Sequence, residues 1–348
     1  MKKSPVSYIC LMILALWSCE TEDIDQPGWL VPMTAEEDPH LPSLMFNGSP
    51  LHLETFGKLE NPILIFLHGG PGSDYRAMIS ERYVENVSRY PDQRNIAKGG
   101  LSRLQDQFFC IFYDRRGSGL SPRFEEDQLH FQDQIDDLDA VITYFLEQKR
   151  AQTGSTETKV SLFGLSFGGY VATAYTNQYP NKINKVVLYE PRPFTQEAMD
   201  LLELTIPFAR VEEDFIDMMT TIGTHFTPDS HARADFLRAV PASNNAVLEL
   251  KEAKDTPYWR LGAFAAFEIE REIRKKKLDI VGNLSAFEGM MLFLTGENTK
   301  AAPDLEAYLD LMTAYYPKSE SRIIPDAAHN GHWENPEAVV QVIQEFFN

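Results

Sequence analysis

The protein has 348 residues, of which 43% are hydrophobic, and this is enough for one large core or for a core with an added cap. Its formal net charge is -19 at pH 7, so the phosphates of a nucleic acid would be repelled by most of its surface. The composition therefore excludes a general nucleic-acid binder, and no nucleic acid is expected as a partner.

The first residues predict export. Lys2 and Lys3 precede an apolar stretch over residues 8–17, which is too short to span a bilayer comfortably. The stretch ends in Leu-Trp-Ser-Cys and resembles a bacterial lipobox, which implies that Cys19 is lipidated and becomes the first mature residue. We therefore expect a signal peptide over residues 1–18. An ordinary secretory signal that ends near a cysteine is the alternative.

An acidic, Pro-containing segment follows and is expected to act as a tether over residues 19–43. Several lipid chains on Cys19 would hold the protein to a membrane, because membrane affinity grows with each chain. In some Gram-negative groups an acidic run after the lipidated cysteine accompanies transfer to the outer face of the outer membrane. The expected location is thus the cell envelope of a Gram-negative bacterium, anchored in the outer membrane.

Strand and helix patterns then alternate along the chain. An Asn-Gly pair at Asn47 and Gly48 predicts a hairpin of two short strands between residues 44 and 56. Continuous apolar runs predict buried parallel strands, and apolar residues at a helical period predict helices. The strands expected after the hairpin cover residues 62–67, 108–113, 159–163, 185–189, 290–294 and 321–324; the helices cover residues 133–148, 170–179, 305–315 and 336–347.

The alternation breaks between residues 192 and 277, where the pattern is helical and rich in aromatic residues. Strand–helix alternation on both sides of one helical block predicts an α/β fold, a mostly parallel, doubly wound sheet. A helical cap is inserted between the sixth and seventh strands. We assign residues 44–191 to the first part of the core, residues 192–285 to the cap and residues 286–348 to the second part of the core.

Residues 164–168 read Gly-Leu-Ser-Phe-Gly and fit the pattern G-x-S-x-G between a predicted strand and a predicted helix. In this setting a tight turn exposes the serine at the carboxyl end of the sheet. Ser166 is therefore the expected nucleophile of a serine hydrolase with the α/β-hydrolase fold. The backbone N–H groups of Gly70 and Phe167 are the expected oxyanion-hole donors, because Gly70 lies in a glycine-rich turn after the first central strand. His68 is expected to brace that turn.

Three motifs together resemble the prolyl iminopeptidase family: His-Gly-Gly-Pro-Gly from residue 68, Asp-Arg-Arg-Gly-Ser-Gly-Leu-Ser from residue 114, and the serine motif. Members of that family are α/β-hydrolases that release an N-terminal residue, often proline. The resemblance covers residues 44–190 and 290–348. It implies an aminopeptidase that forms an acyl-enzyme on short peptides, with Asp114 and Arg116 in structural roles.

The expected general base lies after the last predicted strand. Residues 328–336 resemble the common ending G-H-x-x-x-x-E-N-P, with Ala328 in the glycine place and His329 as the histidine. His329 would take the proton of Ser166 and return it to the leaving group. His332 is the less favoured alternative.

The third member of the triad departs from the family pattern. Iminopeptidases carry an aspartate three residues after a glycine at this point, but here Gly296 is followed by Thr299, which carries no charge. One replacement is a nearby acid, Glu297 or Asp304. The other is Glu190, which ends the preceding core strand, as the acid does in certain haloalkane dehalogenases. A carboxylate at a strand end is costly unless it is paired, so Glu190 is the expected acid. The alternative is that Glu190 has a structural role and forms an ion pair with the nearby Arg192.

In the predicted cap, residues 264–268 loosely resemble an aromatic-x-x-aromatic-Glu segment of iminopeptidase caps, in which the glutamate binds the free α-amino group of the substrate. Glu268 is thus the candidate substrate-binding residue. Because Glu270, Arg271 and Glu272 are close by in the sequence, a solvated helix face is the interpretation that the sequence favours. No metal-ligand spacing and no phosphate-binding loop are present in the sequence, so neither a metal nor a cofactor is expected.

Two further functions stay open at this stage. A carboxylesterase would use the same catalytic groups on small esters. A catalytically silent hydrolase fold could instead bind a ligand at the cell surface, and the missing aspartate at Thr299 is the only argument for it. The expected partners are accordingly a small molecule or short peptide and, through Cys19, a membrane.

Overall fold

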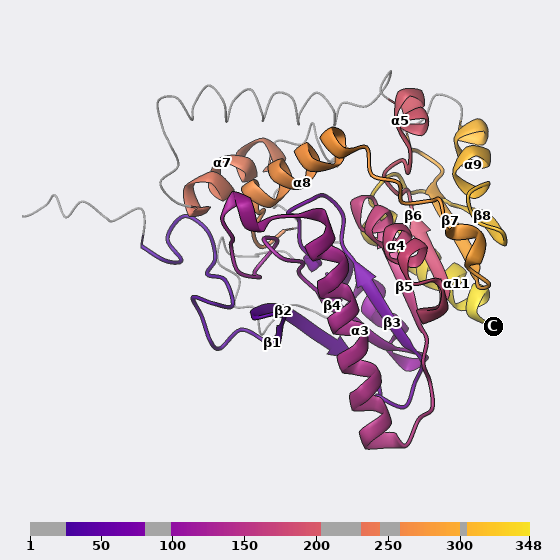
Figure 1. The fold of residues 1–348 in the computed structure, drawn as a ribbon, viewed down its shortest axis with the longest axis horizontal. Coiled ribbons are helices and arrows are strands. Elements are labelled where there is room, and N and C mark those ends of the chain that lie inside the picture. Colours follow the sequence, from indigo (N-terminus) through magenta and orange to yellow (C-terminus); the bar gives the residue numbers. More distant parts are fainter. Residues whose placement is uncertain (1–25, 81–98, 203–230, 244–257, 300–304) are drawn as a thin grey trace, which may run out of the picture.

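A computed structural model describes residues 26–80, 99–202, 231–243, 258–299 and 305–348 (Figure 1). The predicted signal peptide, Cys19 and the first part of the predicted tether lie outside these residues. Within them, no helix combines the length and apolar character needed to cross a membrane. Part of the predicted tether packs on the core: Val31, Ala35 and Leu41 are buried, and the Ala35 N–H donates to the carbonyl oxygen of Leu120.

One eight-stranded sheet organises the core, in the order β1-β2-β4-β3-β5-β6-β7-β8. The β1–β2 and β2–β4 pairs are antiparallel, and all other neighbours are parallel. This is the mostly parallel sheet that the sequence predicts. The strands are β1 (Ser43–Phe46), β2 (Ser49–Phe56), β3 (Ile63–Leu67), β4 (Phe109–Tyr113), β5 (Val160–Leu165), β6 (Ile183–Tyr189), β7 (Met290–Gly296) and β8 (Ser319–Ile324).

The predicted hairpin is confirmed at β1 and β2. Asn47 and Gly48 join the two strands with φ values of 47° and 80°. Positive φ at both central residues is the requirement of the tight turn that matches the twist of antiparallel strands, and asparagine and glycine adopt it most readily.

Helices cover both faces of the sheet. Strand residues such as Ile65 and Leu188 form one buried cluster with α3, α4 and α9, whereas their neighbours Phe66 and Val187 cluster with η2 and α11 on the other face. Side chains alternate between the faces because successive residues of a strand point in opposite directions. The core helices are α2 (Arg76–Ile79), η2 (Gly100–Asp106), η3 (Glu126–Gln128), α3 (Phe131–Thr153), α4 (Phe167–Gln178), η4 (Pro180–Lys182), η5 (Leu284–Ala286), α9 (Leu305–Thr313), α10 (Gly331–Glu334) and α11 (Pro336–Phe347).

Between β6 and β7 the described residues form the helices α5 (Gln196–Leu202), α7 (His231–Ser243) and α8 (Ala263–Lys276). Figure 1 shows α7 and α8, in orange, lying side by side across one end of the molecule. The start of α8 reaches the loop after β3, because the Gly262 N–H donates to the carbonyl oxygen of Gly72 at 2.7 Å. This places helices over the carboxyl end of the sheet. The domain boundaries at residues 191 and 285 stay predictions.

Candidate active site

Ser166 lies between β5 and α4 in a backbone conformation that few residues adopt, with φ of 50° and ψ of -117°. A non-glycine residue with such dihedrals is strained, and the strain persists only where neighbours fix the turn. The flanking glycines permit it. A Cβ on Gly164 would lie 2.6 Å from the carbonyl oxygen of Gly168, and one on Gly168 would overlap that of Leu67. The motif therefore forms the sharp strand-to-helix turn that the sequence predicts.

Backbone hydrogen bonds tie this turn to the end of β6. The Ser166 N–H donates to the carbonyl oxygen of Tyr189 at 2.9 Å, and the Ser166 carbonyl accepts the N–H of Arg192 at 3.0 Å. Leu165 and Tyr189, the last residues of β5 and β6, are register partners. Ser166 follows β5 and Glu190 follows β6. Because neighbouring strands lie about 4.8 Å apart, these two residues lie next to one another.

Glu190 is buried, with 5% of its surface exposed, and has a φ of 37°. Its Oε2 accepts a hydrogen bond from Nδ1 of His329 at 2.8 Å. The structure thus brings together Glu190 and His329, the acid and the base that the sequence predicts.

Three further donors surround the Glu190 carboxylate, and all are electrically neutral. Oε1 accepts from the Thr295 hydroxyl at 3.0 Å and from the Gly296 N–H at 2.9 Å, and Oε2 accepts from the Thr299 hydroxyl at 3.1 Å. Burial by itself would raise the pKa of Glu190, but the hydrogen bonds from His329, Gly296 and Thr295 outweigh it and lower the pKa. The carboxylate is therefore ionised at neutral pH.

From the sequence alone, Thr299 indicates only the loss of an aspartate. The structure shows that its hydroxyl contacts the carboxylate at Glu190, so the residue at the vacated position helps to hold the relocated acid. The other candidates lie elsewhere. Glu297 is exposed and accepts the N–H of Asp326, and Asp304 is outside the described residues.

Arg192 does not pair with Glu190. Its guanidinium binds Glu270 of the cap helix α8 through both terminal nitrogens, with Nη2 2.8 Å from Oε1. Arg274 donates to the same oxygen of Glu270 at 2.7 Å. The structural explanation considered for Glu190, an ion pair with Arg192, is thus wrong for this chain, and Arg192 instead joins the end of β6 to the cap.

The loop that carries His329 is held on both sides. Tyr189 donates through its hydroxyl to the Ala328 carbonyl at 2.7 Å, and the Ala328 N–H donates to Glu334 at 2.6 Å. Asn335 donates to the Pro325 carbonyl at 2.8 Å and accepts from the first turn of α11. The Glu-Asn pair of the sequence ending therefore fixes the histidine loop.

His332, the alternative base, is fully buried in α10, and neither ring nitrogen has a hydrogen-bond partner. Burial and the nearby His329 lower its pKa to about 3, so it is neutral at pH 7. Within the described residues, no hydrogen bond joins it to Glu190. The geometry favours His329.

The predicted oxyanion loop lies against the serine, since a Cβ on Gly69 would lie 3.5 Å from Cβ of Ser166. Gly70 has a φ of 41°, which glycine adopts at little cost. Phe167 is the first residue of α4, where backbone N–H groups have no partner within the helix and the helix dipole favours negative charge. Gly69 and Phe167 thus lie next to Ser166, and the assignment of the Gly70 and Phe167 N–H groups as oxyanion donors stays a prediction.

Residues of the Asp-Arg-Arg motif fix the loops around the site. Asp114 accepts from the backbone of Tyr75 and Leu120, and Arg116 forms two 2.9 Å bonds to Asp137. Sequence reasoning missed the residue between them. Arg115 is buried beneath the oxyanion loop, and its position inside the motif was the only available signal.

Glu268 lies on α8, and 4% of its surface is exposed, so the solvated helix face considered for it and for Glu270 is wrong. It forms an ion pair with Arg271, while its Oε1 is buried and has no hydrogen-bond partner. Burial raises its pKa against the opposing effect of Arg271. Among the described contacts none joins Glu268 to Ser166, Glu190 or His329.

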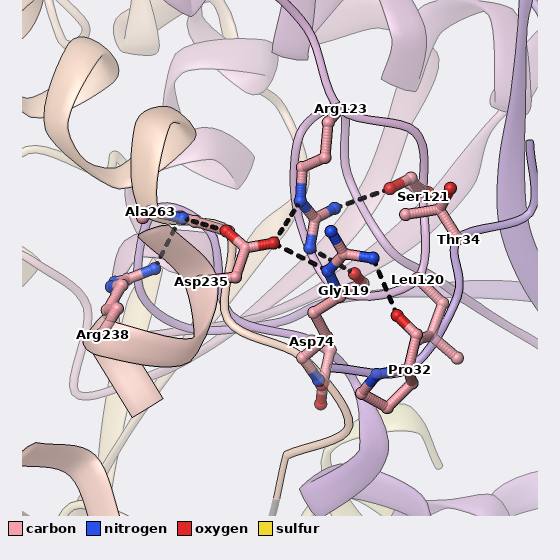
Figure 2. A network of polar contacts seen from close by, with 12 residues as sticks. Pro32, Thr34, Asp74, Gly119, Leu120, Ser121, Arg123, Asp235, Arg238 and Ala263 are labelled. Atoms are coloured by element: carbon pink, nitrogen blue, oxygen red, sulfur yellow. Dashed lines mark hydrogen bonds and ion pairs between the residues drawn. The ribbon is translucent and has the colours of Figure 1, made fainter. Parts of the chain in front are cut away.

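Ionic contacts tie the cap to the core around Asp235 of α7 (Figure 2). Asp235 is fully buried and accepts from Nε of Arg123 at 2.8 Å, from Nε of Arg260 at 2.7 Å and from the Ala263 N–H at 2.8 Å. Arg123 also donates to carbonyls of the loop after β4, which carries the Asp-Arg-Arg motif. This cluster, which sequence reasoning did not find, fixes the cap to that loop.

In the described part of the chain no group of three or more His, Cys, Asp or Glu side chains is arranged to hold a metal ion. Cys110 is a free, buried thiol on β4.

Comparison with known proteins gives relatives of two kinds. A proline iminopeptidase of Pestalotiopsis fici is 27% identical over 152 residues, which cover 42% of this chain and 42% of that protein. A proline iminopeptidase of Heyndrickxia coagulans is 23% identical over 302 residues, covering 82% of this chain and 90% of that protein. Among solved structures, a thermophilic esterase from Thermogutta terrifontis has a TM-score of 0.52 at 22% identity, and the match covers 88% of this chain and 96% of the esterase.

A family model described as the alpha/beta hydrolase fold matches residues 62–336. That range includes β3 to β8, the serine turn, the cap and the histidine loop. The protein belongs to the α/β-hydrolase fold family.

Proposed function

We propose that the protein is a serine hydrolase that works through an acyl-enzyme, with Ser166 as nucleophile, His329 as general base and Glu190 as the orienting acid. The observation that carries the proposal is the 2.8 Å hydrogen bond between His329 Nδ1 and Glu190, beside the strained Ser166 turn. Because Nδ1 donates to a carboxylate, the neutral imidazole has its lone pair on Nε2, which is the nitrogen that must take the serine proton.

In the proposed reaction, Ser166 Oγ attacks the substrate carbonyl carbon while its proton passes to His329. The resulting oxyanion accepts hydrogen bonds from the N–H groups of Gly70 and Phe167. His329 then returns the proton to the leaving amine or alcohol, and the bond to that group breaks. Water then attacks the acyl carbon while its proton passes to His329. The bond between the acyl carbon and Ser166 Oγ breaks, and His329 returns the proton to Oγ, so the acid is released and Ser166 is free again. Throughout, Glu190 stabilises the imidazolium without being protonated.

For the substrate class we propose short peptides with a free N-terminus, cleaved as an iminopeptidase does. The three sequence motifs and the two relatives named proline iminopeptidase support this. Glu268 is proposed to bind the substrate's α-ammonium group, because its Oε1 is buried and unpaired. Blocking the substrate N-terminus should then abolish turnover, and Glu268→Gln should raise KM for peptide arylamides by about 10-fold or more, since a hydrogen bond to a charged group contributes about 1.5–3 kcal/mol.

A carboxylesterase is the second candidate, and one observation favours it. The two buried glutamates of α8 already form ion pairs, Glu268 with Arg271 and Glu270 with Arg192. This reduces the negative charge that the described part of the cap can offer to an ammonium group. An ester substrate would not need such a charge. Unchanged kinetics in Glu268→Gln would favour this candidate.

A substrate panel tests the proposal. Proline and alanine arylamides are compared with p-nitrophenyl esters, using the wild-type protein and Ser166→Ala. Hydrolysis of arylamides that Ser166→Ala abolishes supports the peptidase, and hydrolysis of esters alone supports the esterase. A matched pair, His329→Gln and His332→Gln, should separate the base from its buried neighbour, because only the first should lose activity. If a fluorophosphonate fails to label Ser166, a binding protein without catalysis becomes the better explanation.

We further propose that the protein is exported and lipid-anchored at Cys19 in the outer membrane of a Gram-negative bacterium. The basic, apolar and lipobox-like segments of the first 19 residues support this. Wild-type protein should incorporate labelled palmitate and fractionate with membranes, whereas Cys19→Ala should do neither. Membrane association of the unlabelled variant would argue against the anchor.

A further inference from the structure

Arg115 is a buried cation whose hydrogen bonds go to neutral groups. Only 1% of its surface is exposed, and its Nε and Nη1 have no hydrogen-bond partner. Nη2 donates to the carbonyl oxygens of Gly69 at 3.2 Å and Gly70 at 3.0 Å. A buried charge without an ion pair is costly, and the neighbouring Asp114 attracts the guanidinium without forming an ion pair with it. The position of the charge, beneath the oxyanion loop, therefore needs a functional explanation.

His68 acts on the same carbonyl. The Arg115 backbone N–H can only donate, so Nε2 of His68, 3.2 Å away, must accept. The ring proton is then on Nδ1, which donates to the Gly69 carbonyl oxygen at 2.9 Å. Nη2 of Arg115 lies 3.1 Å from the same Nδ1, and because both nitrogens carry protons this approach is a packing contact and not a hydrogen bond. Burial and the positive charge of Arg115 lower the pKa of His68 well below its usual value, which keeps the ring in this neutral form.

Two donors thus converge on the oxygen of one peptide group. The carbonyl of Gly69 and the N–H of Gly70 belong to the same planar amide and point in opposite directions. Holding the oxygen fixes the direction of the N–H. A charged donor on the oxygen also polarises the amide and makes its N–H a stronger donor, because linked hydrogen bonds strengthen one another.

We propose that Arg115 is a positioning residue of the oxyanion hole, which aims and polarises the Gly70 N–H through the Gly69 carbonyl. The proposal rests on the hydrolase function proposed above. The guanidinium also lies 5.1 Å from the centre of the Phe167 ring, within the range of a cation–π contact. One side chain therefore contacts both residues that supply the proposed donors.

The test measures kcat, KM and the rate of fluorophosphonate labelling in Arg115→Met and Arg115→Lys. An oxyanion hole acts on the transition state, so kcat should fall while KM changes little. Loss of one oxyanion donor reduces kcat by about 100- to 1000-fold, and a misdirected donor in Arg115→Met should reduce it by about 10- to 100-fold. Labelling should slow in parallel. Arg115→Lys keeps the charge and should retain more activity than Arg115→Met.

Arg116→Gln is the matched control. Arg116 is the next residue of the same loop and pairs with Asp137, away from the Gly69 carbonyl. It should lose stability in urea while kcat per folded molecule stays near the wild-type value. If Arg115→Met does not fold, the kcat of Arg115→Lys decides, because it reaches the loop with a different donor geometry and should still be reduced.

Wild-type kcat in the folded Arg115 variants, or a loss confined to KM, would overturn the role of Arg115 and leave the proposed hydrolase intact. A wild-type protein that neither turns over substrate nor labels at Ser166 would overturn both.

Discussion

The carboxyl end of the sheet and the cap helix α8 each bury a glutamate, and the two carboxylates have opposite kinds of partner. Glu190 and Glu270 have 5% and 4% of their surfaces exposed. Glu190 accepts from two hydroxyls, a backbone amide and the imidazole of His329. Glu270 is bound by the guanidinium groups of Arg192 and Arg274.

This difference separates a carboxylate that serves an imidazole from one that holds two elements together. Burial opposes ionisation at both sites, and hydrogen bonds lower the pKa of both. At Glu270, however, the neighbouring cations neutralise the charge. At Glu190 the hydroxyl and amide donors stabilise the anion without neutralising it, so its negative charge is available to an imidazolium at His329.

The largest expected effect comes from removing the charge at the sheet end. Glu190→Gln keeps the size of the side chain but no longer favours the proton on Nδ1 of His329, so kcat should fall by about 10⁴-fold, as loss of an orienting carboxylate does in serine proteases. Steady-state kinetics on the best substrate of the panel measures this. Glu297→Gln, at an exposed glutamate close by, is the control and should be near wild type. A loss of less than about 10-fold would move the acid elsewhere.

The Glu190→Gln background also tests why Thr299 is not an aspartate. The Thr299 hydroxyl contacts Glu190, so Thr299→Asp in the single variant would place two carboxylates together, which disfavours ionisation of both. In the Glu190→Gln background the same change supplies the missing charge and should restore part of kcat. Failure to restore any activity would show that the two positions are not interchangeable.

The cap glutamate should behave in the opposite way. Glu270→Gln leaves Arg192 and Arg274 without their shared carboxylate, and breaking a buried ion pair costs about 3–5 kcal/mol. The free energy of unfolding, from urea titration, should fall by about this amount, while kcat of the folded protein changes little. Arg274→Gln is the matched control, because this arginine is half exposed, and it should cost less than about 1 kcal/mol.

Most of the fold could be predicted from the sequence because the buried parallel strands are short apolar runs with clear ends. The strand predicted at residues 185–189 is β6, Ile183–Tyr189, in the structure, and Glu190 follows it directly, as predicted. The donors to Glu190 could not be predicted in the same way. Thr295 lies 105 positions away and meets Glu190 only because Tyr189 and Leu294 are register partners, which no local pattern reveals.

The cap was harder to predict for a related reason. Helical spacing shows which residues of α8 share a face, but it does not show what that face packs against. From the sequence alone, a solvent-exposed face therefore explained Glu268 and Glu270 as well as a buried face did. Their burial depends on Arg271 and on Arg192, and the latter is 78 positions from Glu270. The partner of Arg115 within the oxyanion loop was hidden in the same way, although its motif was recognised.

Lowering the pH should reduce the stability of the wild type more than that of Glu270→Gln, because only the wild type has an ionisable carboxyl group in the contact between Arg192 and the cap helix α8. The pKa of Glu270 in the folded protein lies below the ordinary value of 4.5, so the unfolded chain takes up protons first as the pH falls. The stability that Glu270 contributes is present above pH 4.5 and is lost as the pH falls through the folded-state pKa, by about 1.4 kcal/mol for each pKa unit of the shift. Urea titrations from pH 7 to pH 3 should therefore show a shallower decline for Glu270→Gln than for the wild type. Parallel curves would contradict the assignment.

The smallest expected effect concerns a single neutral donor at the sheet end. Thr299→Val keeps the shape of the side chain but removes the hydroxyl that donates to Oε2 of Glu190 at 3.1 Å. A hydrogen bond of this kind contributes about 0.5–1.5 kcal/mol, so kcat should fall by about 2- to 10-fold with KM unchanged. Thr299→Ser retains the donor and should be close to wild type. If Thr299→Val were as active as Thr299→Ser, Thr295 and Gly296 would suffice to hold the acid, and the hydroxyl at the family's aspartate position would have no part in the reaction.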